Sequence, residues 1–177
     1  KLEEQGEPDV LYRNDGGGRF SAVPWNSDYF LDESRKPLPE PWEFGLSVQM
    51  RDMNGDGFPD IYVCNDFQSV DRFWVNDGHG KFRALDRIGL RKESYSAMGV
   101  DFADLDRDGH LDFLVVEMLA RDHSQRMRQN MAAPSALPVP GRIEDRPGFM
   151  QNMLFHNRGD GTYAEIANYS GVAASDW

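Results

Sequence analysis

A nine-residue acidic pattern occurs twice in the chain and constrains its fold more than any other feature. It occupies residues 52–60 (Asp-Met-Asn-Gly-Asp-Gly-Phe-Pro-Asp) and 104–112 (Asp-Leu-Asp-Arg-Asp-Gly-His-Leu-Asp). Each copy is followed by four apolar residues, at 61–64 and 113–116, that are rich in β-branched and aromatic types. Such a run predicts a strand that is buried on both faces. The identical spacing of the two copies indicates a repeat.

The residue types in this pattern suit a hard cation. Side-chain oxygens at loop positions 1, 3 and 5 can converge on calcium, and the glycine at position 6 (Gly57 and Gly109) permits the sharp turn. An EF-hand would also need a bidentate Glu at position 12, where this chain has Val63 and Val115. Because the fourth carboxylate comes at position 9 and a strand follows, we reject an EF-hand and predict calcium loops that join strand to strand. The alternative is ordinary Asp/Gly-rich turns on an acidic protein.

Composition excludes some partners. The chain has 177 residues, with 19 basic and 30 acidic side chains and a formal net charge of -11. This acidity argues against nucleic acid as a partner, since phosphate binding needs basic patches. No apolar run approaches a membrane span and no signal peptide is evident. Calcium loops favour an extracytoplasmic location (periplasmic, cell-surface or secreted), where calcium is abundant. The single cysteine, Cys64, is interpreted as a core residue.

A second pattern predicts three β-hairpins, each an apolar strand followed by a Gly-rich turn and an aromatic residue. The three lie at residues 10–20, 73–82 and 153–163. Hairpins and acidic loops alternate, so one complete unit would have four strands. These are expected at residues 45–51, 60–65, 72–76 and 81–85. Four short antiparallel strands per unit is the make-up of a propeller blade.

The alternation divides the chain into five expected segments. They are residues 1–23 (second half of a blade), 24–43 (a connecting insert), 44–96 (a complete blade), 97–167 (a blade with an inserted loop at 120–150) and 168–177 (the lead-in to a next blade). The loop at 120–150 begins with a stretch that could hold a short helix, with Met127 and Met131 one turn apart. Because such a segment cannot close a ring, we expect open strand edges that remaining blades or a protein partner would cover.

The acidic patterns resemble the calcium motif of FG-GAP/VCBS repeats, the blades of integrin-α-like β-propellers. Gly45 and Gly99 stand where the strand of that family enters the loop. The Leu-Tyr-Arg-Asn-Asp-Gly hairpin, with residues 118–123 and 150–154, resembles bacterial members of the cartilage-acidic-protein-like subgroup. The resemblance implies an all-β fold, a partial β-propeller of four-stranded antiparallel blades with strand-to-strand calcium loops.

The resemblance, with which the loop chemistry agrees, also implies two Ca²⁺ sites. At the first, the ligands would be the side chains of Asp52, Asn54, Asp56 and Asp60 and the carbonyl of Phe58. At the second, they would be the side chains of Asp104, Asp106, Asp108 and Asp112 and the carbonyl of His110. Because Asn54 is neutral, the first site has one carboxylate fewer, and we expect the second to bind calcium more tightly.

Three functions compete. The leading one is a non-catalytic, calcium-stabilised propeller segment that serves as an extracytoplasmic binding or assembly scaffold. The second is part of an enzyme such as a polysaccharide lyase, some of which contain calcium-binding propellers. Such chemistry needs a placed acid or base, whereas the free carboxylates of this chain are scattered. The histidines share no metal-binding spacing, and we expect them at turn or surface positions. The third is an accessory subunit of a membrane-associated complex that meets an acidic partner through arginines of the insert. These are Arg121, Arg126, Arg128 and Arg142.

Overall fold

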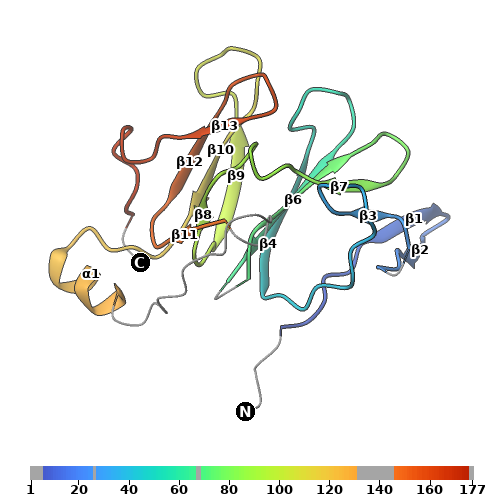
Figure 1. Ribbon diagram of the computed structural model, residues 1–177, viewed down its shortest axis with the longest axis horizontal. Coiled ribbons are helices and arrows are strands. Elements are labelled where there is room, and N and C mark those ends of the chain that lie inside the picture. Colours follow the sequence, from blue (N-terminus) through green and yellow to red (C-terminus); the bar gives the residue numbers. More distant parts are fainter. Residues whose placement is uncertain (1–5, 26, 67–68, 131–145, 176–177) are drawn as a thin grey trace.

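The fold is known from a computed structural model, which describes residues 6–25, 27–66, 69–130 and 146–175 (Figure 1). These residues form mostly β-sheet with one short helix, α1 (His123–Asn130). The all-β expectation is therefore confirmed. The helix lies in the first part of the insert, as predicted. The Pro-rich part of the insert, with Met131 and Arg142, falls outside the described residues.

The strands are short, with two to seven residues each. In chain order they are β1 (Tyr12–Gly16), β2 (Arg19–Ala22), β3 (Phe30–Leu31), β4 (Gly45–Arg51), β5 (Asp60–Asn65), β6 (Arg72–Asn76), β7 (Phe82–Ala84), β8 (Glu93–Ser94), β9 (Gly99–Ala103), β10 (Asp112–Val116), β11 (Gly148–Phe149), β12 (Met153–Asn157) and β13 (Tyr163–Glu165). The three predicted hairpins are confirmed as β1–β2, β6–β7 and β12–β13. The hairpin β1–β2 forms a separate two-stranded sheet.

The first sheet has the strand order β3-β7-β6-β5-β4. Strands β4 to β7 follow one another in antiparallel fashion, with Val48 opposite Val63 and Met50 opposite Ile61. At the outer edge, β3 pairs in parallel with β7. The segment expected only to connect two units therefore also contributes a strand to the sheet.

The second sheet has the order β13-β12-β10-β9, with antiparallel pairing throughout. Phe102 lies opposite Phe113 and Val100 opposite Val115. This register repeats that of the first sheet, so each sheet contains four antiparallel strands that neighbour one another in chain order, with an acidic loop between the first two. Figure 1 shows the two sheets side by side.

Aromatic side chains between the sheets form the main core. The ring of Phe113, only 1% exposed, stands at its centre. It contacts the rings of Tyr62, Phe73, Phe102, Phe155 and Tyr163. Because Tyr62 and Phe73 come from the first sheet and the others from the second, burial of this cluster holds the two sheets together.

Strand β5 is buried on both faces, as its sequence predicts. Tyr62 and Cys64 point into the main core, whereas Ile61 and Val63 belong to a second apolar cluster on the opposite face. Burial raises the pKa of the Cys64 thiol, which agrees with an inert core role. Strand β10 differs from the prediction, because Val116 on its second face is 37% exposed.

A buried ionic cluster lies where the insert returns to the sheets. It comprises Glu43, Asp71, Arg72, Glu93 and Arg146. Nε of Arg72 donates to Oε1 of Glu43 at 2.8 Å, and Oδ2 of Asp71 accepts from the Tyr62 hydroxyl at 2.8 Å. Burial raises the pKa of Asp71 to about 7, and the nearby Glu43 charge adds to this rise while Arg146 opposes it. The strand pair β8–β11 brings Arg146 to this place.

Candidate metal loops

The two acidic patterns form loops with the same backbone shape. The first acidic loop (residues 52–60) joins β4 to β5, and the second acidic loop (residues 104–112) joins β9 to β10. Both therefore connect antiparallel strands, which confirms the rejection of an EF-hand. Gly57 and Gly109, at position 6, have φ angles of 89° and 91°. A side chain at either position would strain the turn, as predicted.

Position 4 shows a difference between the loops. Gly55 has a φ angle of 77°, and Arg107 adopts nearly the same backbone conformation with a φ of 66°. A long side chain rarely adopts this left-handed region. The second acidic loop therefore takes up some strain at Arg107 to keep the shape that glycine gives the first.

The aspartate at position 1 organises each loop from within. The carboxylate of Asp52 accepts the amide protons of Asp56 at 3.0 Å and Gly57 at 2.8 Å. The carboxylate of Asp104 accepts the corresponding amide protons of Asp108 and Gly109, at 3.1 and 3.0 Å. These bonds curl the backbone so that the side chains at positions 1, 3 and 5 gather on one side of the loop.

The donor atoms of the second acidic loop fit a divalent cation. One carboxylate oxygen from each of Asp104, Asp106 and Asp108 lies within 4.8 Å of the others, and all three side chains are exposed. Calcium binds oxygens at about 2.3–2.6 Å, so ligands on opposite sides of an ion are about 5 Å apart. Three like charges at this spacing repel one another, and a bound cation would remove that cost.

The first acidic loop has one carboxylate fewer than the second, because position 3 is Asn54. Nδ2 of Asn54 donates to Oδ2 of Asp56 at 2.9 Å, where the second loop has two carboxylates instead. The backbone amide of Asp56 donates both to the carboxylate of Asp52 and to the amide oxygen of Asn54, so a neutral oxygen lies beside a charged one. This arrangement also fits calcium, which accepts amide oxygens among its ligands.

The aspartate at position 9 is buried beneath the first acidic loop. One oxygen of Asp60 accepts the amide of Met53 at 3.0 Å, and the other accepts the amide of Asn76 at 2.8 Å. Burial raises the pKa of Asp60 to about 6, while these amides lower it and the charges of Asp56 and Asp52 raise it further. Asp60 therefore joins the start of the loop to the neighbouring hairpin. Each oxygen keeps a second lone pair that a cation can use.

Asp112 makes the same connection in the second sheet. Its carboxylate accepts the amide of Leu105 at 3.1 Å and the amide of Asn157 at 2.8 Å. Nδ2 of Asn157 then donates to the carbonyl of Leu111 at 3.2 Å, as Asn76 does to the carbonyl of Pro59 in the first sheet. The two hairpin asparagines thus hold the acidic loops in place. The sequence contains a signal for this role, because both asparagines stand directly before the turn of their hairpin.

The side chain at position 7 also packs in the same way in both sheets. The ring of Phe58 lies against Gly78, and the ring of His110 lies against Gly159. An added Cβ at either glycine would stand 2.6 Å from a ring atom. Glycine in the hairpin turn therefore leaves room for the acidic loop, in addition to allowing the turn itself.

His156 lies beside the second acidic loop, which corrects the expectation that the histidines have turn or surface positions without metal-binding geometry. It is half-buried in β12, with Nδ1 3.1 Å from Oδ1 of Asp112 and 3.7 Å from Oδ2 of Asp106. Donor atoms of these three residues lie within 4.8 Å of one another. The sequence did not reveal this group, because β12 follows β10 only after the long insert. Val75 holds the corresponding place in the first sheet.

The arginines of the insert partly serve structural roles. Nε of Arg121 donates to the carbonyl of Ala174 at 2.8 Å, and Nε of Arg126 donates to the carbonyl of Ala120 at 2.9 Å. Arg128 is exposed in the last turn of α1. Arg121 therefore joins the insert to the segment that follows β13, and Arg126 forms a bond within the insert. A docking role for this group stays a prediction.

These observations define an all-β chain with two successive antiparallel sheets that carry equivalent acidic loops. Residues 52–115 match the family model for the FG-GAP-like repeat. The match includes both acidic loops and the strands between them, and it supports the FG-GAP family for this part of the chain. Comparison with curated proteins finds no match. Within the described residues, no helix has the length and apolar character needed to cross a membrane.

Proposed function

We propose that the two sheets are successive blades of a calcium-stabilised, non-catalytic β-propeller segment that serves as an extracytoplasmic binding or assembly scaffold. The observation that carries this proposal is the equivalence of the two acidic loops. They share the position-6 turn, the position-1 amide contacts and the position-9 link to the next hairpin. The match to FG-GAP-like repeats over the same residues supports it.

Calcium would stabilise the crossover between the first two strands of each sheet. Asp52, Asn54 and Asp56 would hold one ion, and the three exposed carboxylates of the second acidic loop would hold the other. The ion supplies positive charge that offsets repulsion between the carboxylates. At ten to a hundred times its dissociation constant, such an ion stabilises the folded state by about 1.4–2.7 kcal/mol per site.

A non-catalytic role agrees with the burial of two acids whose pKa values are raised. Asp71 and Glu93, whose pKa values burial raises strongly, are enclosed in the buried ionic cluster. General acids and bases must instead reach a substrate. A groove beside β4 in the first sheet is lined mostly by apolar side chains. We therefore propose that the chain works through its surfaces and sheet edges, with protein as the partner.

Calcium titration of an Asn54 variant tests the proposed sites. The wild-type chain should bind two calcium ions in isothermal titration calorimetry, with the second acidic loop binding more tightly. Asn54→Asp adds a fourth carboxylate to the first acidic loop and should raise the affinity of that site several-fold, because ligand charge tunes calcium affinity.

The exposed variant Asn168→Asp adds the same charge outside both loops and is the matched control. It should leave both affinities unchanged. Equal calcium affinities for Asn54→Asp and the wild type would contradict the ligand assignment of the first acidic loop. A chain that binds no calcium at all would contradict the proposed function.

A further inference from the structure

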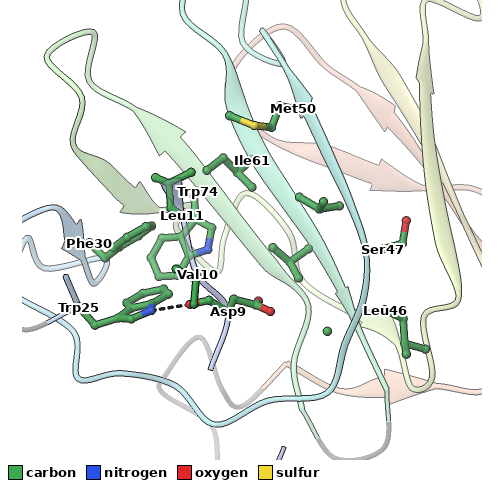
Figure 2. Close-up of a pocket in the computed structure, with 13 residues that line it drawn as sticks. Asp9, Val10, Leu11, Trp25, Phe30, Leu46, Ser47, Met50, Ile61 and Trp74 are labelled. Carbon is green, nitrogen blue, oxygen red and sulfur yellow. Dashed lines mark hydrogen bonds between the residues drawn. The ribbon is translucent and has the colours of Figure 1, made fainter. Parts of the chain in front are cut away.

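An apolar groove of about 380 Å³ lies between the segment that precedes β1 and the first sheet (Figure 2). Ile61 and Trp74 contribute to its lining, together with Leu46, Val48 and Met50 of β4. Val48 and Met50 are 58% and 49% exposed. A row of apolar side chains on an edge strand is a surface that proteins normally cover, because it readily pairs with other chains.

In the second sheet, the equivalent row of apolar side chains is covered. Val100 and Phe102 on β9 hold the positions of Val48 and Met50, since each pair faces corresponding residues of the following strand. Both are only 8% exposed. Strand β9 packs against β4, and the ring of Phe102 lies 6.1 Å from that of Tyr62 on β5. A strand–acidic loop–strand segment of the preceding sheet therefore covers this row.

The hairpin β1–β2 resembles the two hairpins that pair with a strand–acidic loop–strand segment. Oδ1 of Asn14 accepts the amide of Gly16 at 2.8 Å, as Asn76 and Asn157 do with the glycines of their own turns, both at 3.0 Å. In the two sheets, these asparagines also bind an acidic loop, and their hairpins pair with β5 and β10. Within the described part of the chain, β1 pairs with β2 alone.

We propose that this groove binds one further strand–acidic loop–strand segment of the same repeat pattern. Its second strand pairs with the free edge of β1, and its apolar face covers Val48 and Met50. The aspartate that ends its acidic loop accepts the backbone amide of Asn14, as Asp60 accepts that of Asn76. A second copy of this chain is a poorer occupant, because its own β4–β5 segment is already paired with β6. Binding of such a segment rests on the proposed function and gives the scaffold a specific partner.

A peptide of residues 45–65 provides the probe, since it contains β4, the first acidic loop and β5. The labelled peptide is titrated with the full 177-residue chain in excess calcium, and fluorescence anisotropy reports binding. We expect saturable one-to-one binding, with new protection from hydrogen exchange in β1 and β4. The double variant Val48→Asp/Met50→Asp of the chain should weaken binding at least tenfold, because it places two charges in the groove.

Ile88→Asp is the matched control, because Ile88 is 63% exposed and does not line the groove. It should leave peptide affinity unchanged, and Asn14→Ala should weaken it several-fold.

Equal binding of a shuffled peptide, or equal binding by the Val48/Met50 variant, would overturn the proposal. Self-association of the chain that requires Val48 and Met50, seen by sedimentation, would identify a second copy as the occupant and overturn it too. Calcium uptake without peptide binding would reject this inference alone, whereas loss of calcium uptake would reject the proposed function.

Discussion

Replacement of Phe113 by alanine is expected to lower the free energy of unfolding by about 3–5 kcal/mol. The ring is 1% exposed and contacts aromatic side chains from both sheets, including Tyr62 at a centroid distance of 5.1 Å and Phe155 at 4.6 Å. Alanine would remove these contacts and leave a cavity that the surrounding strands cannot close. Urea denaturation followed by far-UV circular dichroism measures the change.

Phe20→Ala is the matched control, because Phe20 is an exposed aromatic residue of the hairpin β1–β2. Its replacement should change stability by no more than about 0.5 kcal/mol. If Phe113→Ala costs as little as Phe20→Ala, the two sheets do not share the core described above.

The second large effect is expected at the buried pair of Arg72 and Glu43. Both side chains are nearly enclosed, and Nε of Arg72 donates to both carboxylate oxygens of Glu43, at 2.8 and 3.1 Å. Either Arg72→Met or Glu43→Leu alone should cost about 3–5 kcal/mol, because each removes one partner of a buried, hydrogen-bonded ion pair. The double variant should be more stable than the sum of the single effects indicates, which a double-mutant cycle measures.

The exposed pair of Lys81 and Asp28 offers a control for this cycle. Its removal should have little effect on stability, because water and salt screen surface charges. A coupling between Arg72 and Glu43 as small as that of the exposed pair would show that burial does not strengthen this ion pair.

The strands and acidic loops could be predicted because their signals are local. The expected strands at 45–51 and 60–65 are β4 and β5, and the continuous apolar run at 61–64 predicted that β5 is buried on both faces. The glycine at position 6 follows from a turn that excludes a side chain, so its left-handed φ could be expected at Gly57 and Gly109. These features depend on neighbouring residues alone.

The rest depends on contacts between distant parts of the chain. Strand β3 has only two residues, Phe30–Leu31, too few for any periodicity to show. Arg146 reaches the ionic cluster only because β11 pairs with β8, across the whole insert. His156 lies beside Asp112 for a similar reason, although the two residues are 44 positions apart in the sequence. Pairings of this kind are set by tertiary packing, which local patterns do not encode.

The clearest test of the proposed calcium loops is a crystal structure of the full chain grown with millimolar calcium, with the ions identified by anomalous scattering. We predict one ion in each acidic loop, within about 2.3–2.6 Å of the side-chain oxygens at positions 1, 3 and 5. One would lie on Asp52, Asn54 and Asp56, and the other on Asp104, Asp106 and Asp108. Acidic loops without ions under these conditions, or calcium bound only elsewhere, would contradict the proposal that calcium stabilises the two sheets.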